Sequence, residues 1–181
     1  MSVAGNGVTV LLTGLPSSGK TTLACALAKW LRGEGRQVEV LDGDEMRKLL
    51  SPELGFSRED RGTHVQRIGF IAQLLSSHGV VTLMPVIAPY ASSREAVRAH
   101  HQAAHTSYVE VHVATPLEVC SRRDVKGLYA RQAAGKVSGL TGVDDPYEEP
   151  EAPDMRITTH TEDVKESAAA VYALLRSRRV L

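Results

Sequence analysis

The sequence has little of what several kinds of protein require. It contains only two cysteines, Cys25 and Cys120, without metal-ligand spacing, so we expect both to pack in the core of a protein from a reducing compartment. Lysine and arginine together number 21, as do aspartate and glutamate, so no excess of positive charge is available to hold a nucleic acid. We therefore expect no nucleic-acid partner.

Long apolar runs are also missing. No stretch approaches the roughly 20 apolar residues that a membrane-spanning helix needs. Residues 1–7 lack the basic start and following apolar run of an export signal. These absences predict a cytoplasmic protein without membrane attachment. With 43% apolar and 23% charged residues, the chain is long enough to bury one core, and we expect a single domain over residues 1–181.

What the sequence does contain is an alternation of short apolar runs with longer helical patterns. The runs are rich in β-branched residues, and we interpret their apolar character as continuous rather than alternating, which is typical of parallel strands covered on both faces. They are residues 8–12, 38–41, 80–86, 108–113 and, more weakly, 155–157. The helical patterns are residues 20–31, 45–50, 58–76, 92–103, 116–123, 128–134 and 163–177. The order predicts an α/β fold of three layers, α/β/α, around a mainly parallel five-stranded sheet.

Local signals mark some of the helix ends and one long loop. Ser57 followed by Asp60 resembles a capping box, and Gly79 ends the same helix. Residues 135–153 are rich in glycine, proline, aspartate and glutamate, which favour turns. Long loops inside compact domains are commonly functional, so we interpret this one as a lid over a ligand. A surface loop without a role is the alternative.

A phosphate-binding motif lies between the first apolar run and the first helical pattern. Residues 14–21 read Gly-Leu-Pro-Ser-Ser-Gly-Lys-Thr and match G-x-x-x-x-G-K-[ST] in the expected strand-to-helix context. The N–H groups of such a loop bind phosphates, Lys20 reaches the β- and γ-phosphates, and Thr21 supplies an oxygen to Mg²⁺. We therefore predict a P-loop NTPase-type fold that binds ATP and Mg²⁺. The expected nucleotide contacts are Gly14, Ser17, Ser18, Gly19, Lys20, Thr21 and Thr22.

Two carboxylates, Asp42 and Asp44, follow the second apolar run. In a parallel sheet they lie at the carboxyl end of a strand beside the P-loop, where ligands collect. Asp44 is a candidate for orienting or deprotonating an attacking hydroxyl, and Asp42 for contacting Mg²⁺ through water. The alternative is a simple turn in which Asp44 caps the next helix.

Together these motifs resemble those of the adenylylsulfate (APS) kinase family, over nearly the whole chain. Besides the P-loop, the blocks in family order are Leu41-Asp42-Gly43-Asp44 with Arg47, Leu54-Gly55-Phe56-Ser57 with Asp60-Arg61, Pro89-Tyr90, Arg123-Asp124, Lys126-Gly127-Leu128-Tyr129, and residues 139–148. The P-loop alone is generic, whereas the last two blocks are specific to this family.

The resemblance implies transfer of the ATP γ-phosphate, with Mg²⁺, to the 3′-hydroxyl of APS. The products are PAPS and ADP, and the enzyme is generally a homodimer. By motif position Asp44 resembles the catalytic base, acting with Lys20, and Arg123 resembles an arginine near the ATP base. The residues that the resemblance assigns to APS are Asp42, Asp44, Arg47, Phe56, Arg61, His64, Ile87, Lys126, Gly139 and Leu140. Without the resemblance, we would interpret Phe56 as a core aromatic, and we would interpret Arg61 and Lys126 as solvated charges.

Four positions depart from the family pattern. His64 stands for the usual asparagine, with an exposed helix residue as its alternative interpretation. Ala88 replaces a serine and cannot form a phosphoserine intermediate, so direct transfer is required. Ala91 removes one cation. Leu140 replaces the phenylalanine that forms the second face of the family's adenine sandwich.

These departures leave two other hypotheses open. One is a P-loop kinase for a different nucleotide-like or hydroxyl acceptor, since fold and motif do not fix the substrate. The other is a nucleotide-binding module without catalysis. The presence of Lys20, Thr21 and Asp44 argues against the module.

Overall fold

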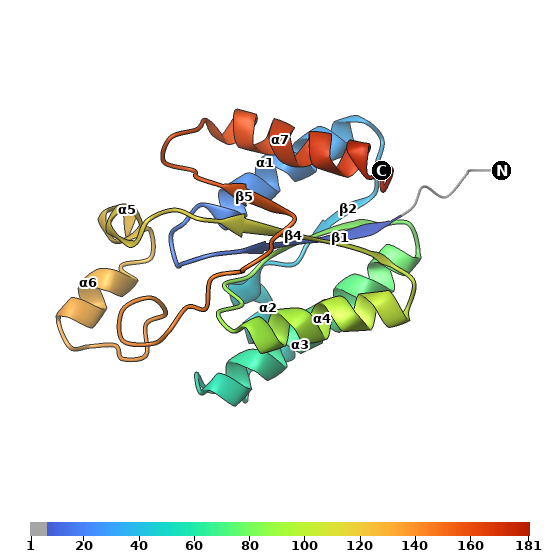
Figure 1. Ribbon diagram of the computed structural model, residues 1–181. Coiled ribbons are helices and arrows are strands. Elements are labelled where there is room, and N and C mark those ends of the chain that lie inside the picture. Colours follow the sequence, from blue (N-terminus) through green and yellow to red (C-terminus); the bar gives the residue numbers. More distant parts are fainter. Residues whose placement is uncertain (1–6) are drawn as a thin grey trace.

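The sheet of the protein is five-stranded and parallel throughout (Figure 1). This computed structural model describes residues 7–181, and residues 1–6, which belong to the segment where we expected no export signal, lie outside the described part. The strand order is β2-β3-β1-β4-β5. The strands are β1 (Val8–Thr13), β2 (Val38–Val40), β3 (Val81–Pro85), β4 (Ser107–Val113) and β5 (Met155–Ile157). The predicted α/β class and parallel sheet are confirmed.

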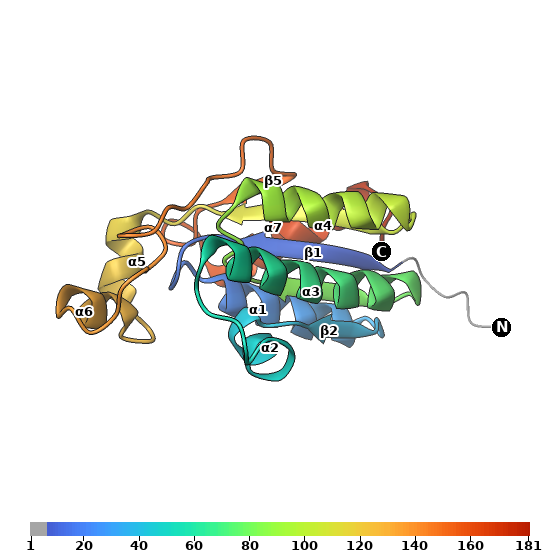
Figure 2. The same ribbon diagram turned by 90° about the horizontal axis from the view of Figure 1, so that it is seen from below.

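Helices cover both faces of the sheet. They are α1 (Lys20–Gly33), α2 (Gly43–Leu50), α3 (Arg58–Ser77), α4 (Ala91–Ala103), α5 (Leu117–Arg123), α6 (Leu128–Ala133) and α7 (Val164–Ser177). Figure 1 shows α1 and α7 on one face and α3 and α4 on the other, with α5 and α6 beyond the carboxyl ends of the strands. Figure 2 shows α3 and α4 lying side by side. They approach so closely that a Cβ on Gly69 would lie 2.6 Å from a methyl carbon of Val97.

The sequence of β1 explains how the layers hold together. Val8, Val10 and Leu12 point into the core beneath α1 and α7, whereas Leu11 points into the core beneath α3 and α4. Every residue of β1 is buried. A strand with apolar side chains on both faces is stable only in the middle of a covered sheet, and this places the P-loop at the centre of the molecule.

The predicted elements all occur, with ends that differ by at most two residues, but two local expectations are wrong. Cys120 is buried as expected, whereas Cys25 is exposed, because the inward stripe of α1 uses Leu23, Ala24 and Leu27 and turns Cys25 outward. The capping box forms only in part. Ser57 accepts from the N–H of Asp60, as predicted.

The carboxylate of Asp60 does not complete that box. It accepts instead from the N–H of Gly55, at 3.1 Å, because the chain preceding α3 turns back over the start of the helix. Among residues 7–181, none of the helices combines the length and apolar character needed to cross a bilayer.

Candidate active site

The P-loop leads from the end of β1 into α1. A Cβ at Gly14 would lie 2.5 Å from the carbonyl oxygen of Val113 on the neighbouring strand. Gly19 precedes α1 with a φ of 102°, a left-handed conformation that glycine adopts without strain. The motif glycines thus stand where a side chain would clash or be strained, so the loop can curl tightly enough to turn its N–H groups inward.

Lys20 is buried within its own loop. Its Nζ donates to the carbonyl oxygens of Gly14, at 2.9 Å, and of Leu15, at 2.6 Å, and lies 3.3 Å from the Oγ of Ser18. Burial lowers the pKa of the ammonium group to about 8. Any phosphate that binds Lys20 must therefore compete with two main-chain carbonyls for the hydrogen bonds that the ammonium group donates.

Asp42 joins the P-loop to α2 through its two carboxylate oxygens. Oδ2 accepts from the Thr21 hydroxyl at 2.7 Å, and Oδ1 accepts from the N–H of Asp44 at 3.0 Å. Asp42 is therefore the N-cap of α2, and the alternative in which Asp44 caps this helix is wrong. The reason is position, since Asp42 has an extended backbone just before the helix and Asp44 already lies in its first turn.

Thr21 and Asp42 also offer hard oxygen ligands beside the P-loop. Within residues 7–181 there is no cluster of three or more histidine, cysteine or acidic side chains that could hold a metal ion unaided. Mg²⁺ in nucleotide sites commonly takes one or two protein oxygens and completes its shell with phosphates and water. The pair fits a magnesium ion that arrives with a nucleotide.

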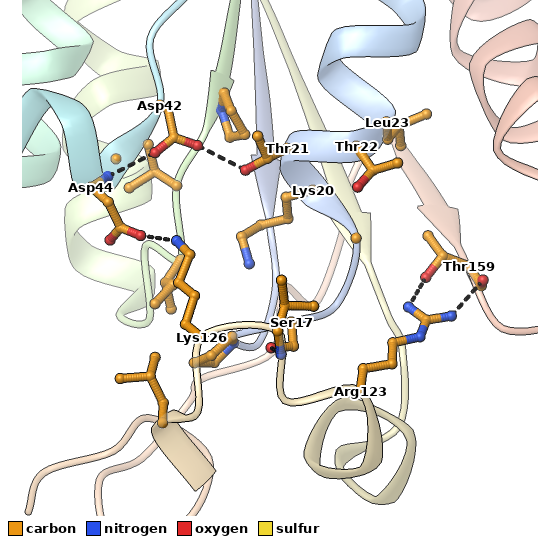
Figure 3. A pocket seen from close by; sticks show the side chains of 18 of the residues that line it. Ser17, Lys20, Thr21, Thr22, Leu23, Asp42, Asp44, Arg123, Lys126 and Thr159 are labelled. Atoms are coloured by element: carbon orange, nitrogen blue, oxygen red, sulfur yellow. Dashed lines mark hydrogen bonds and ion pairs between the residues drawn. The ribbon is translucent and has the colours of Figure 1, made fainter. Parts of the chain in front are cut away.

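A cavity of about 390 Å³ lies between the P-loop, α2 and the segment after α5 (Figure 3). It brings together eleven of the residues singled out in the sequence. They are Ser17, Gly19, Lys20, Thr21, Thr22, Asp42, Asp44, Ile87, Arg123 and Lys126, with Gly43 of the acidic turn. Donor-side and acceptor-side residues therefore share one space.

Asp44 and Lys126 form an ion pair within this cavity, drawn as a dashed line in Figure 3. Their side chains are 61% and 57% exposed, so the pair is well solvated and easily opened. Lys126 lies between α5 and α6, far from α2 in the sequence. Both residues carry motifs in the sequence, but no pattern in the sequence predicts their contact.

The far side of the P-loop is closed by Arg123. Its guanidinium donates to the side-chain and main-chain oxygens of Thr159, at 2.9 and 2.8 Å (Figure 3). It also approaches the carbonyl of Ser18 at 3.4 Å. Thr159 follows β5, the strand next to β4, and was missed. Its place at the carboxyl end of a predicted strand is the one signal that could have found it. Val164 of α7 also lines the cavity.

Three residues assigned to the acceptor form a group outside the cavity lining. Phe56 is 65% exposed, and the guanidinium carbons of Arg47 and Arg61 lie 4.8 and 5.5 Å from the centre of its ring. Arg47 donates to the carbonyl of Gly55 at 2.9 Å, and Arg61 to that of Phe56 at 2.8 Å. The interpretation of Phe56 as a core aromatic is therefore wrong. An exposed ring flanked by two cations can receive a flat, anionic ligand.

Arg61 also ties α3 to the predicted lid, the loop of residues 135–153, none of which is among the cavity-lining residues. It donates to the carbonyl of Gly139 at 2.6 Å and to the hydroxyl of Thr141 at 2.9 Å, and it lies 3.3 Å from Asp145. With its side chain only 11% exposed, it is not a solvated charge. The lid is thus held against α3.

Leu140 faces away from this group. It is 6% exposed and packs with Cys120 and Tyr129, beneath α5 and α6. Its N–H and that of Gly139 donate to the carboxylate of Asp144, which lowers the pKa of this acid. The tip of the lid is therefore a closed turn with an apolar anchor.

His64 is buried, so its interpretation as an exposed helix residue is wrong. Its Nε2 lies 2.9 Å from the carbonyl of Gly43, and its Nδ1 lies 3.0 Å from the Oγ of Ser51. A carbonyl only accepts, so Nε2 carries the proton and Nδ1 accepts from the serine. Burial lowers the pKa of the ring. His64 thereby fixes the start of α2, which carries Asp44.

The turn after β3 closes the remaining side of the cavity. Ile87 lines the cavity, and its carbonyl accepts from Thr13. Ala88 has a φ of 44°, and its carbonyl accepts from the buried Arg94 at 2.8 Å. Neither Ala88 nor Ala91 is among the cavity-lining residues.

A P-loop lysine and an acidic side chain at the carboxyl edge of a parallel sheet, facing one cavity, define a P-loop kinase of small molecules. Comparison with known proteins agrees with this class. The chain belongs to the adenylylsulphate kinase family, whose model matches residues 6–158.

Individual relatives support the assignment. The adenylyl-sulfate kinase of Synechococcus sp. (strain JA-3-3Ab) is 49% identical over 175 residues, covering 97% of each chain. The Mycobacterium tuberculosis APS kinase, solved in complex with AMPPNP and APS, is 41% identical, with a TM-score of 0.92 over 95% of this chain and 99% of that one. A hexameric APS kinase from Thiobacillus denitrificans is 34% identical, with a TM-score of 0.74, covering 98% of this chain and 30% of that one.

Proposed function

We propose that the chain is an adenylyl-sulfate kinase, which transfers the γ-phosphate of ATP to the 3′-hydroxyl of adenosine 5′-phosphosulfate and so makes PAPS and ADP in sulfate assimilation. The observation that carries the proposal is the shared cavity in which Lys20 and Asp44 meet. The similarity to an APS kinase solved with AMPPNP and APS supports it.

On the donor side, the N–H groups of the P-loop and the ammonium group of Lys20 bind the phosphates. Lys20 turns from the carbonyls of Gly14 and Leu15 toward the β- and γ-phosphates. Arg123, held by Thr159 at the opposite rim, lies near the ATP base and phosphates. These contacts fix the γ-phosphorus relative to the acceptor, which is most of what phosphoryl transfer requires.

On the acceptor side, the carboxylate of Asp44 takes the proton of the 3′-hydroxyl. The oxygen forms a bond to the γ-phosphorus while the bond between that phosphorus and the β,γ-bridging oxygen breaks, and ADP leaves. Lys126 moves from Asp44 to the anionic substrate, which frees the carboxylate to act as base. Since residue 88 is alanine, transfer is direct.

Recognition of APS rests on the group around Phe56. The exposed ring offers a face to the adenine, and Arg47 and Arg61 offer charge to the phosphosulfate. Arg61 also holds Gly139 of the lid, so substrate and lid share one arginine.

Thr21 and Asp42 hold the Mg²⁺ that accompanies ATP, directly or through water. When bound, the ion neutralises charge on the β- and γ-phosphates. We also propose a homodimer, for which the self-association of the Thiobacillus relative gives general support. Because the reaction consumes ATP, we propose the cytoplasm as its compartment.

The test is a panel of acceptors offered to the purified protein with ATP and Mg²⁺, with products identified by mass spectrometry. We expect PAPS and ADP in equal amounts with APS, and no product with 5′-AMP, shikimate or gluconate. Lys20→Met provides the inactive control. Phosphorylation of another acceptor but not APS would keep the kinase class and overturn the substrate. ATP binding without any transfer would favour a nucleotide-binding module.

A further inference from the structure

One hydroxyl group connects three parts of the site. Thr13 is the last residue of β1, fully buried, and its Oγ1 lies 2.6 Å from the carbonyl oxygen of Ile87 and 2.9 Å from the hydroxyl oxygen of Tyr147. A carbonyl oxygen only accepts, so Thr13 gives its single proton to Ile87. Tyr147 must then donate to Thr13. The chain of hydrogen bonds therefore runs in one direction, from the lid through β1 to the turn after β3.

The surroundings of Tyr147 preserve this direction. Burial raises the pKa of its hydroxyl to about 12, so the group stays protonated around neutral pH. Its ring lies 5.8 Å from the ring of His112, whose pKa burial and the nearby Arg156 lower to about 4. Both groups are thus neutral near pH 7, and the tyrosine remains a hydrogen-bond donor.

The turn that receives the bond is itself firmly held. Ala88 has a positive φ, and the carbonyl of Ala88 accepts from Arg94, which lies 3.4 Å from the buried Glu110. The N–H of Glu148, the residue after Tyr147, donates to the carbonyl of Pro89 at 2.8 Å. Lid and turn are therefore joined directly by a main-chain hydrogen bond, and Thr13 is where β1 contacts both.

We propose that Thr13 and Tyr147 are positioning residues, which set the distance between the phosphates on the P-loop and the acceptor held against Ile87. Thr13 directly precedes Gly14, the first residue of the phosphate cradle, and Ile87 lines the cavity. Neither Thr13 nor Tyr147 lines the cavity, so both act through their neighbours. The inference rests on the proposed kinase function. Small misplacements of reacting groups have large effects on phosphoryl transfer, which gives this link its importance.

The first test removes the donor with Tyr147→Phe. We expect kcat with APS to fall about 3- to 10-fold, the range that one neutral hydrogen bond covers, while the Kd for ATP changes less than about twofold. The matched control is Tyr108→Phe, because the buried hydroxyl of Tyr108 has no hydrogen-bond partner among residues 7–181. Equal kcat values for the two variants would overturn the proposal, as would a parallel loss of ATP affinity in Tyr147→Phe.

The second test uses Thr13. Thr13→Ser keeps the hydroxyl and should keep kcat within about twofold, whereas Thr13→Val should lose at least as much as Tyr147→Phe. Since both changes break the same link, the double variant Thr13→Val/Tyr147→Phe should be no slower than Thr13→Val alone. A loss of kcat in the double variant equal to the product of the two single losses would contradict a shared role. If Tyr147→Phe does not fold, equal kcat values in the serine and valine variants overturn the proposal.

Hydrogen exchange on the free protein separates this inference from the proposed function. Tyr147→Phe should speed exchange in residues 87–91 and 139–148, and Tyr108→Phe should not. Unchanged exchange overturns the link whatever the activity of the protein. If the unaltered protein makes no PAPS but Tyr147→Phe still speeds exchange, the APS kinase assignment is overturned. The hydrogen-bonded link between lid, β1 and turn is then still supported.

Discussion

The ammonium group of Lys126 pairs with the carboxylate of Asp44 across the cavity that also contains the P-loop lysine. The proposed base and a cation proposed for the substrate thus neutralise each other in the free protein. An anionic substrate that attracts Lys126 would release the carboxylate at the moment when a hydroxyl arrives. Binding and activation are in this way coupled by one exchangeable ion pair.

Replacing Asp44 with asparagine tests the assignment of the base. Asp44→Asn keeps the size of the side chain and removes its ability to take a proton, so kcat should fall about 10²- to 10⁴-fold. The Kd for ATP should stay nearly the same, because the P-loop is untouched. Glu45→Gln, at the exposed neighbouring position, is the control and should retain activity. Steady-state kinetics with unaltered turnover in Asp44→Asn would refute the role.

The pH dependence of ATP binding should reveal Lys20. Burial lowers the pKa of its ammonium group to about 8, so the free protein loses this charge as the pH rises through that value. Bound phosphates favour the charged form and raise the pKa again. ATP binding should therefore take up a proton near pH 8, and the Kd should rise up to about tenfold per pH unit above it.

Calorimetry in buffers of different ionisation enthalpy measures that proton uptake. Lys20→Arg, whose guanidinium does not titrate in this range, should abolish it while keeping a positive charge. Identical binding heats in all buffers at pH 8 would show that Lys20 does not titrate there.

His64 should contribute to stability through its two hydrogen bonds. His64→Ala removes the donor to the carbonyl of Gly43 and the acceptor of the Ser51 proton, so the free energy of unfolding should fall by about 1–3 kcal/mol. The exposed His78 provides the control, since His78→Ala should lower the free energy of unfolding much less. Urea unfolding measures both, and equal losses would contradict the structural role.

The same residue makes a pH prediction with a definite sign. Burial lowers the pKa of folded His64 below its ordinary 6.5, so the unfolded chain binds the proton first as the pH falls. The contribution of neutral His64 to the free energy of unfolding is complete above pH 6.5 and is lost as the pH falls below that value. His64→Asn retains a donor and an acceptor without titrating, so its stability should fall less than that of the unaltered protein between pH 7.5 and 5.5.

Leu140→Phe distinguishes a core position from a substrate contact. Because Leu140 is buried against Cys120 and Tyr129, the larger ring should overpack this cluster and lower the free energy of unfolding by about 1–3 kcal/mol. The KM for APS should not improve. Tighter APS use with unchanged stability would instead show that this position faces the adenine.

Much of the fold could be predicted because its signals are local. The run that forms β1 carries apolar side chains on both faces, which only a covered strand tolerates, and the P-loop motif requires glycine where the backbone turns. Helix ends were accurate where one side chain defines them, as Ser57 does. Asp60 was misassigned because its choice between two N–H groups depends on the path of the preceding chain.

The parts of the site that could not be predicted depend on contacts between distant segments. Thr159 carries no motif and acquires its contact with Arg123 only because β5 pairs with β4. The apolar cluster under α5 and α6 decides which way Leu140 faces. The pairing of Asp44 with Lys126 depends on where the segment between α5 and α6 folds back. Residue types alone suggested which side chains act, but not which of them meet.

The strand order has a consequence for the timing of synthesis. β5 is the last strand in the chain and pairs with β4 at the edge of the sheet, yet it delivers Thr159 to the nucleotide rim. A growing chain that has left the ribosome only as far as β4 already contains the whole P-loop but lacks the partner that holds Arg123. The nucleotide site is therefore complete only after β5 has been synthesised and has joined the sheet.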